Sequence, residues 1–497
     1  MQPEQEIDLP LPQFTASGAP LDELHRGCNC RDRRSRPETL LLTPDLVITA
    51  RDRAREPELP QATLAHVLST PISPRQARYD VIVVSDGSGD KEREARIAAE
   101  FARHEHRVYH LGDHTGLKKR PVAPTLHRVA LPTSVSRNGQ RLFETLEALR
   151  QTEGLEAAAL FAPSALDVAV LREMRRRWNW RIVVGPDTPT MLQDAADVRL
   201  SFGGAGGEAR LNRSVHLPAT MPWPAHWAAI DQALRNSWPR ASIVVLTHDN
   251  LAFSRMCLAS VLENTDYPNY ELVVVDNASS DGTVEELQAI AGRLPNVKVI
   301  LNDFNAGFGP GNNQGLRAAT GDILVLLNND TIVPRGWLTR LGNHLEDPNL
   351  GIIGPATNRS CNEAQIDFPY QTYSEFQAVA ASQSERQDGE RYSIRMPMMF
   401  CVAFRRDTYD RLGPLDERYE VGMFEDEDYA LRAKAEGLHV AWTPEVYVHH
   451  AYHASIGKLL PTGEYMRLVK LNQGRFEEKW GICWERHRPL PGGSRST

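Results

Sequence analysis

The sequence predicts an α/β fold made of two successive units, each built on a parallel sheet. Short apolar runs of four or five residues recur within residues 77–217 and again from residue 241. Segments with the apolar spacing of helices lie between several of these runs. A segment rich in proline and tryptophan, residues 218–240, separates the two series and is expected to be a linker. Strands that alternate with helices are typical of parallel sheets covered on both faces.

The composition fits a globular protein and argues against two classes of function. The chain has 497 residues, and at roughly 100–200 residues per domain this length predicts two or three domains. A net charge of −8 and a pI of about 6.1 argue against binding to nucleic acid. No apolar stretch approaches the roughly 18 residues that span a bilayer, and residues 1–10 lack the apolar core of a signal peptide.

The six cysteines are scattered along the chain, which favours reduced thiols. We therefore expect a cytoplasmic protein, and the sequence leaves peripheral contact with the inner face of a membrane open.

The first unit is expected to be a Rossmann-like domain over residues 77–217, preceded by an irregular arm over residues 1–76. Its expected strands cover residues 80–84, 107–111, 129–131, 157–161, 181–184 and 198–202. Its expected helices cover residues 92–104, 142–150 and 168–178.

The second unit is expected over residues 241–485, followed by a tail over residues 486–497. Its expected strands cover residues 242–246, 271–275, 297–301, 323–327 and 439–442. Its expected helices cover residues 252–262, 282–293, 311–319, 337–345, 425–437 and 465–480.

Polar side chains follow three strands of the second unit, where an open parallel sheet collects its ligands. Thr247 and Asn250 follow the first strand, Asp276 follows the second, and Asn329 and Asp330 follow the fourth. Turn chemistry alone explains any one of these groups, but three in one unit favour a ligand site. A carboxylate that emerges from a buried strand, as expected for Asp330, can hold a divalent ion against a diphosphate.

A glycine-rich segment, residues 305–313, precedes the third expected helix and includes Asn305, Gly307 and Asn313. Glycines at this place allow close approach of the backbone to a ligand, and a helix N-terminus favours anions. The spacing fits neither the dinucleotide fingerprint nor the P-loop, so an ordinary helix cap is the alternative.

Four carboxylates, residues 425–428, stand at the start of another expected helix. The helix dipole explains two of the four, and a carboxylate in a half-buried pocket can act as a general base on a sugar hydroxyl. His449 and His450 follow the strand expected at 439–442, and either is a candidate for a further metal ligand. A surface or core histidine is the alternative.

The motifs of the second unit resemble those of the family 2 glycosyltransferases of GT-A fold, in the rhamnosyltransferase-like branch. The matching stretches occur in the order of that family at residues 275–283, 305–315, 327–331, 424–432 and 446–450. The chain departs from the family at Asn328-Asn329-Asp330, where the usual Asp-x-Asp keeps only its last carboxylate. Modest affinity for the metal is therefore expected.

The resemblance implies an inverting transfer from a UDP- or dTDP-sugar to a saccharide or glycoconjugate, as in polysaccharide biosynthesis. It implies that Asp426 is the catalytic base, with Glu425 beside it in the catalytic group. It also implies that Asp330 holds Mn²⁺ or Mg²⁺ with a histidine, for which His450 is favoured over His449. The expected donor site comprises Thr247, Asn250, Asp276 (which would read the base), Asn305, Gly307, Asn313, Asn329 and Asp330.

The first unit resembles the N-terminal Rossmann half of GT-B glycosyltransferases at residues 80–84, 92–109 and 196–200. No second Rossmann half follows it, which favours a role in acceptor binding or assembly over an independent enzyme. Two alternatives stay open for the second unit. A nucleotidyltransferase is expected to carry a basic, glycine-rich loop where residues 247–250 stand, and a carbohydrate-binding scaffold without catalysis would keep the same fold.

Overall fold

The structure is a computed structural model of the 497-residue chain. It describes residues 79–84, 91–104, 106–112, 125–130, 139–153, 157–161, 180–184, 196–202, 214–217, 223–451 and 464–487, with a few single residues between these ranges. The expected arm, most of the helix expected at 168–178 and the tail beyond residue 487 lie outside this part. Residue contacts divide the chain into two compact units, whose described parts lie within 79–238 and 239–487.

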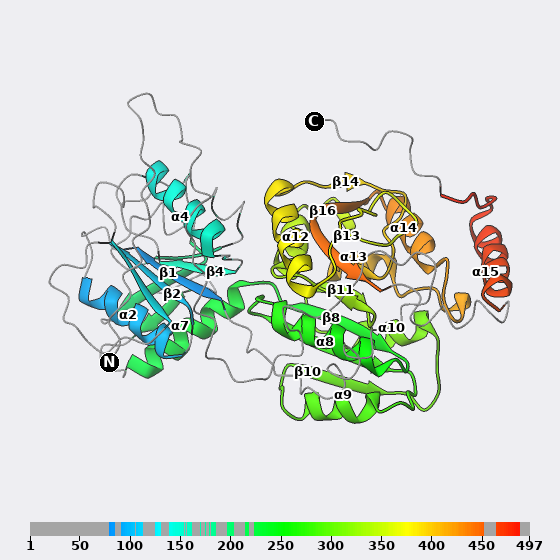
Figure 1. Cartoon of the computed structure of the whole chain (residues 1–497), viewed down its shortest axis with the longest axis horizontal. Coiled ribbons are helices and arrows are strands. Elements are labelled where there is room, and N and C mark those ends of the chain that lie inside the picture. The colour runs from blue at the N-terminus through cyan, green and yellow to red at the C-terminus, as the bar shows by residue number, and fades with distance from the viewer. Residues whose placement is uncertain are drawn as a thin grey trace. The chain divides into compact units, whose positions relative to one another are not determined.

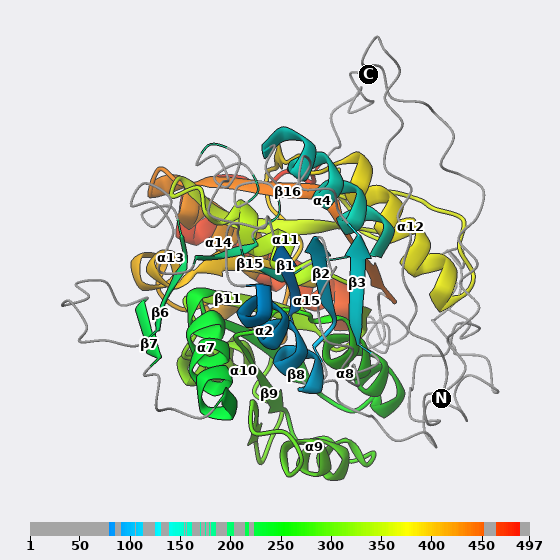
Figure 2. The same ribbon diagram turned by 90° about the vertical axis from the view of Figure 1, so that its left-hand side faces the viewer.

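The first unit contains a seven-stranded sheet in the order β3-β2-β1-β4-β5-β6-β7. Every neighbouring pair of strands is parallel, as the alternating pattern predicts. Figure 2 shows β1, β2 and β3 side by side. The strands are β1 (Asp80–Val84), β2 (Val108–Gly112), β3 (Leu126–Ala130), β4 (Ala158–Phe161), β5 (Arg181–Val184), β6 (Val198–Phe202) and β7 (Ser214–Leu217).

Helices cover both faces of this sheet, because successive side chains of each strand point to opposite faces. Ile82 and Val84 of β1 pack in one core with apolar residues of α4 (Gly139–Glu153). Helices α2 (Lys91–Arg103) and α7 (Trp223–Ser237) contact each other and the strands on the other side (Figure 1). Residues 218–240, expected to be a linker, therefore include a helix that packs against the first unit.

The second unit contains a nine-stranded mixed sheet in the order β10-β9-β8-β11-β15-β13-β16-β12, with β14 paired to β16. The strands β8, β9, β10 and β11 are parallel, whereas β15 runs antiparallel to β11 and β13. The strands are β8 (Ala241–Thr247), β9 (Tyr270–Asp276), β10 (Val297–Leu301), β11 (Ile323–Asn328), β12 (Thr331–Ile332), β13 (Leu350–Thr357), β14 (Tyr392–Ser393), β15 (Cys401–Arg405) and β16 (His439–His450). The α/β class is confirmed, but the antiparallel strands were not expected.

The helices of the second unit are α8 (Leu251–Asn264), α9 (Thr283–Ala291), α10 (Phe308–Ala318), α11 (Trp337–His344), α12 (Tyr373–Arg386), α13 (Arg406–Leu412), the 3₁₀ turn η1 (Glu417–Tyr419), α14 (Glu425–Ala435) and α15 (Glu464–Trp480). Helix α12 was missed by the sequence patterns, although Thr372 and Glu375 form a capping box at its start. No helix in the described ranges is long and apolar enough to cross a membrane.

Helix α10 lies unusually close to the sheet, and two glycines one turn apart make this possible. A Cβ atom at Gly311 would lie 2.5 Å from the side chain of Leu246, and a Cβ atom at Gly315 would overlap Val244. The glycines inside the helix thus serve helix–sheet packing, whereas Gly307 with φ of 91° precedes the helix. Their number in this segment reflects packing as well as any approach to a ligand.

We predict that Gly315→Ala lowers the free energy of unfolding by about 1–3 kcal/mol, because the added methyl group overpacks the core against Val244. Urea denaturation measures the change. Gly474→Ala in α15 is the matched control, since a Cβ atom there meets nothing within 4 Å. It is expected to stabilise the protein slightly by reducing the freedom of the unfolded chain. Equal stability of the wild type and the Gly315 variant would contradict the close packing.

Candidate active site

Five of the residues expected in the site lie at or just after the ends of three neighbouring parallel strands. Strand β8 lies between β9 and β11 and is parallel to both, so their carboxyl ends share one edge of the sheet. Thr247, Asp276 and Asn328 stand at the ends of these strands. The edge brings together the loops that begin at residues 248, 277 and 329.

Asp276 is fully buried, and its carboxylate fixes the loop after β9. It accepts hydrogen bonds from the hydroxyl of Thr247 at 2.9 Å, and from the backbone nitrogen and hydroxyl of Ser279 at 2.8 and 2.5 Å. Thr247 is also fully buried. Both side chains thus hold the edge of the site in shape, and their expected contact with a donor stays a prediction.

Backbone strain is concentrated around this edge and before α14. Among the described residues, the non-glycine residues with positive φ all belong to the second unit. They are Asp249, Asn250, Ala278, Glu420, Met423 and Phe424. Non-glycine residues in the left-handed region cost of order 1–3 kcal/mol and persist only where their surroundings hold them, often at functional sites.

Side-chain amides connect the end of β9 to the glycine-rich loop. The amide nitrogen of Asn277 donates to the side-chain oxygen of Asn305 and to the carbonyl of Gly307, both at 3.1 Å. Asn305 also accepts from the backbone nitrogen of Gly307 at 3.0 Å, while its side chain is exposed. Asn305 and Gly307 thus lie at the accessible rim, as expected.

Asn313 does not reach this rim. It is fully buried in α10, and its amide oxygen accepts from the backbone nitrogen of Leu415 at 2.9 Å. Its amide nitrogen donates to the carbonyl of Leu415 and to the carboxylate of Glu417, both at 2.9 Å. The structure therefore gives Asn313 a role in holding the segment before α14.

Asp330 lies beside His450, although the two are far apart in sequence. The Nε2 atom of His450 is 3.3 Å from Oδ1 of Asp330. Strand β12 pairs with the end of β16, which places Thr331 opposite His450 and Ile332 opposite His449. Because successive residues of a strand face opposite ways, only one of the two histidines can face Asp330.

His449 points into the core instead. Its Nδ1 atom shares a hydrogen bond of 2.6 Å with the hydroxyl of Tyr370, and its ring packs edge-on against Phe376. Burial lowers the pKa of His449 to about 3, with a smaller contribution from His450, so the ring is neutral. Tyr370 is a partner that the sequence patterns did not reveal.

The surroundings of His450 fix its orientation. Its ring stacks on Phe400 with centroids 4.8 Å apart, and its backbone nitrogen donates to the side-chain oxygen of Asn358 at 2.7 Å. A carboxylate oxygen and an imidazole nitrogen that converge in this way suit Mn²⁺. Within the described ranges no three potential ligand side chains cluster, so an ion here would need further oxygens from a phosphate or water.

Two neighbours of Asp330 at the loops have different surroundings. Asn329 is buried and donates to the hydroxyl of Ser254 in α8 at 2.9 Å. Asn250 is half-buried, directly before α8, and its amide donates to the carbonyl of His248 at 3.4 Å. Of these two expected donor residues, Asn250 is the more accessible.

The four carboxylates at the start of α14 divide into two pairs. Glu427 is buried and accepts from the guanidinium of Arg395 at 2.8 Å and from the indole of Trp484 at 3.0 Å. Asp428 is fully buried, with the ammonium of Lys479 at 2.6 Å and the guanidinium of Arg432 at 3.0 Å. These two residues are part of the packing around the helix.

Glu425 and Asp426 have different surroundings. Both are half-buried, and within the described part of the chain neither has a cationic side chain at ion-pair distance. Burial raises the pKa of Asp426 to about 7. Burial and, to a smaller extent, the charge of Asp426 together raise the pKa of Glu425 to about 8. Near neutral pH this pair therefore holds about one proton and one negative charge.

Residues 398–400 lie beside His450 and beside Cys361. Phe400 stacks on His450, and the sulfur of Met398 lies 3.6 Å from the thiol of Cys361. Burial raises the pKa of that thiol, and the nearby charge of Asp426 raises it further.

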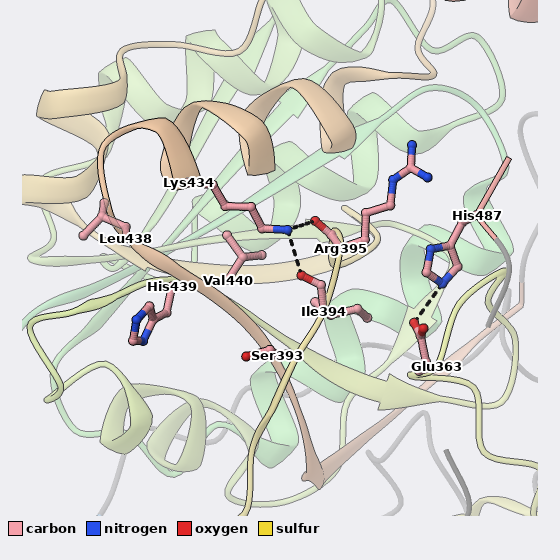
Figure 3. Close-up of a pocket in the computed structure, with 9 residues that line it drawn as sticks. All are labelled: Glu363, Ser393, Ile394, Arg395, Lys434, Leu438, His439, Val440 and His487. Atoms are coloured by element: carbon pink, nitrogen blue, oxygen red, sulfur yellow. Dashed lines mark hydrogen bonds and ion pairs between the residues drawn. The ribbon is translucent and has the colours of Figure 1, made fainter. Parts of the chain in front are cut away.

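A separate cavity of about 450 Å³ lies on the flank of α14 (Figure 3). Its lining includes Lys434, whose ammonium donates to the carbonyls of Ile394 and Arg395, and His487, which pairs with Glu363 at 2.9 Å. None of its lining residues belongs to the expected site.

Comparisons with known proteins converge on one family for the second unit. Residues 242–413 match the model described as Glycosyl transferase family 2. An uncharacterized protein, y4gI, of Sinorhizobium fredii is 27% identical over 237 residues, which are 44% of this chain and 25% of that protein. The O-antigen biosynthesis protein RfbC of Myxococcus xanthus is 25% identical over 249 residues, which are 46% of this chain and 18% of that protein.

This chain therefore aligns with a quarter or less of the length of each of these two relatives. Among solved structures, a mannosyltransferase of Pyrobaculum calidifontis in complex with GDP-Man and Mn²⁺ is 22% identical, with a TM-score of 0.36, over 48% of this chain and 64% of that protein. The family match and the parallel strands β8 to β11 together support a GT-A fold for the second unit.

We predict that Asp428→Asn lowers the free energy of unfolding by about 2–4 kcal/mol, because two cations lose their shared partner. The matched variant Asp426→Asn is expected to be at least as stable as the wild type at pH 8. Since burial raises the pKa of Asp426, ionisation of this carboxyl opposes folding above its folded pKa, and the amide removes that cost. Urea unfolding at pH 8 compares the two, and equal destabilisation would contradict the division into pairs.

Proposed function

Residues 242–413 are a family 2 glycosyl transferase domain, and from this premise we propose that the chain transfers a sugar from a nucleotide diphosphate to a hydroxyl group of a saccharide or glycoconjugate. The observation that carries the proposal is the pair Glu425–Asp426, a half-buried acidic pair near neutral pKa at the start of α14. A base with a pKa near the working pH is suited to remove a proton from a sugar hydroxyl.

Asp426 is the proposed base. Its Oδ1 atom accepts a hydrogen bond from the backbone nitrogen of Glu427 at 2.9 Å, which helps to orient the carboxylate. Glu425 has the higher pKa and keeps its proton when Asp426 is ionised, so the pair bears a single charge.

In the proposed step the acceptor oxygen loses its proton to Asp426 and forms a bond to the anomeric carbon of the donor. The bond from that carbon to the diphosphate oxygen breaks, and its electron pair leaves with the nucleotide diphosphate. A single displacement of this kind inverts the anomeric configuration.

Asp330 and His450 are the proposed ligands of a divalent metal, with Mn²⁺ favoured by the imidazole nitrogen. A bound ion supplies charge that stabilises the leaving diphosphate. The chain itself orients both ligands, through the pairing of β12 with β16 and the stacking of Phe400 on His450.

The accessible polar residues at the sheet edge, Asn250, Asn305 and Gly307, are the proposed contacts of the donor. The name of the relative RfbC, an O-antigen biosynthesis protein, supports a saccharide acceptor in polysaccharide assembly. A nucleotidyltransferase is disfavoured because the loop after β8 carries Asp249, which accepts from the backbone of Ser280, where a basic glycine-rich loop is expected.

We predict that Asp426→Asn abolishes sugar transfer, with a loss of at least about 100-fold, while the protein still binds nucleotide diphosphate. Transfer is measured by release of UDP, dTDP or GDP across a panel of sugar donors with mixed saccharide acceptors. Binding is measured by titration calorimetry with the released nucleotide and Mn²⁺. The control is Glu436→Gln beyond the C-terminal end of α14, where the side chain pairs with Arg411 on the surface.

The pH profile provides a second measurement on the same pair. Because burial raises the pKa of Asp426 to about 7, kcat/KM is expected to rise with pH up to about 7 and to level off above it. Transfer by the Asp426 variant at the wild-type rate would reject the base. A carbohydrate-binding scaffold would release no nucleotide in any arm.

We predict that EDTA suppresses transfer, and that added Mn²⁺ or Mg²⁺ restores it. His450→Ala is expected to raise the concentration of Mn²⁺ needed for half-maximal rate by about 10-fold or more, since an ion there loses one of two protein ligands. His449→Ala is unsuitable as a control because it removes a core contact, so His439→Ala, at an exposed histidine at the start of β16, serves instead and is expected to leave the Mn²⁺ requirement unchanged. Full activity in chelator would remove the metal from the proposal.

A further inference from the structure

Helix α15 lies against the turn that precedes the acidic pair. Asn472 of this helix is fully buried, and its amide nitrogen donates to the backbone carbonyls of Tyr419 and Gly422, both at 2.8 Å. Arg475, one turn further on, donates to the carbonyl of Arg418 and to the carboxylate of Glu420, both at 2.6 Å. One face of α15 thus binds the main chain of residues 418–422.

This turn is strained. Glu420, Met423 and Phe424 have φ values of 48°, 78° and 76°, in the left-handed region that side chains disfavour. The strained residues lead directly into Glu425, the first residue of α14. A conformation of this cost persists only because other contacts hold it, and the amide of Asn472 supplies two of them.

The same helix also holds the flank of α14. Lys479 places its ammonium 2.6 Å from Asp428 and 2.7 Å from Asp416, and the indole of Trp480 donates to Asp428 at 2.9 Å. The ring of Phe476 packs against Phe424 with centroids 5.5 Å apart. Helix α15 therefore contacts both the turn that precedes α14 and Asp428 in the first turn of α14.

We propose that Asn472 is a positioning residue for the transfer reaction: from α15 it locks the turn 419–424 and thereby fixes the direction of Glu425 and Asp426. This inference rests on the proposed function. It extends the active machinery to a helix that lies outside residues 242–413, the part that matches the family. Apart from a bond with Arg475 on its own helix, the side chain of Asn472 bonds only backbone carbonyls of the turn among the described residues, so it acts through the geometry of the turn.

The test is Asn472→Ala in the full chain, assayed with the donor that the panel selects. The expected result is a 10- to 100-fold fall in kcat, because displacement of a reacting group by about 1 Å can cost about 100-fold. The Kd for the released nucleotide with Mn²⁺ and the KM for the donor are expected to stay within about twofold. Each kcat is divided by the number of nucleotide-binding sites found by calorimetry, so that partial unfolding does not imitate the effect.

Gln473→Ala is the matched control, since that neighbouring side chain bonds only within α15, to Glu477 at 2.9 Å. It is expected to retain wild-type kcat. If Asn472→Ala does not fold, Asn472→Ser decides: the short hydroxyl keeps a polar group at this place but has a single donor for the two carbonyls, and a fall in kcat of about threefold or more is expected.

Unchanged kcat per binding site in the folded Asn472→Ala variant, or in Asn472→Ser where that variant decides, overturns the inference. A parallel fall in kcat and in nucleotide affinity also overturns it, because it indicates general loss of structure. If Asp426→Asn retains transfer, the proposed base itself fails. If Asp426→Asn is inactive and Asn472→Ala is normal, only the positioning role fails.

Discussion

The buried carboxylate of Asp428 holds together the part of the second unit that surrounds the acidic pair. It forms ion pairs with Arg432 on its own helix and with Lys479 on α15, and it accepts a hydrogen bond from the indole of Trp480. A buried carboxylate is costly unless it is paired and hydrogen-bonded, so these partners must assemble together. The sheet, α14 and α15 consequently form one packed body whose geometry is set from both sides of the helix.

This arrangement explains how two of four adjacent carboxylates can remain near neutral pKa. Each carboxylate of the second pair has a cationic partner. Glu427 is paired with Arg395, and Asp428 is paired with Lys479. Glu425 and Asp426 have no cationic side chain at ion-pair distance within the described residues, burial raises the pKa of both, and the charge of Asp426 favours the protonated form of Glu425. The cationic side chains around the start of α14 are thus paired with Glu427 and Asp428, whereas the proposed reactive pair has no such partner within the described residues.

The parallel strands β8 to β11 of the second unit could be predicted from the sequence because they contain apolar runs, the clearest being those of β8 and β11. Strand β13 could not, since Gly351, Gly354 and Pro355 interrupt it and such residues are typical of loops. Both glycines are required by close neighbours, Leu438 and Pro397, which only the folded chain brings near. Local patterns thus identify the strands that carry the site and miss those that complete the sheet.

The same limit applies to the candidate site. Asp330, Asp426 and the two histidines were identified as residues, but the pairing of β12 with β16 decides which histidine faces Asp330. Asp276 and Asn313 match the motifs equally well, yet both are fully buried with their polar atoms engaged. A motif therefore cannot distinguish a residue that contacts a ligand from one that holds the loop, since both depend on the same side chain at the same place.

The turn 419–424 connects the two halves of the proposed reaction. On one side its backbone is bound by Asn472, and on the other the carbonyl of Glu420 lies so close to Gly307 that a Cβ atom there would overlap it. Gly307 is thus required twice, by its φ of 91° and by this contact. The loop proposed to meet the donor and the turn that leads to the base therefore pack directly against each other, and this contact fixes the distance across which the sugar would be transferred.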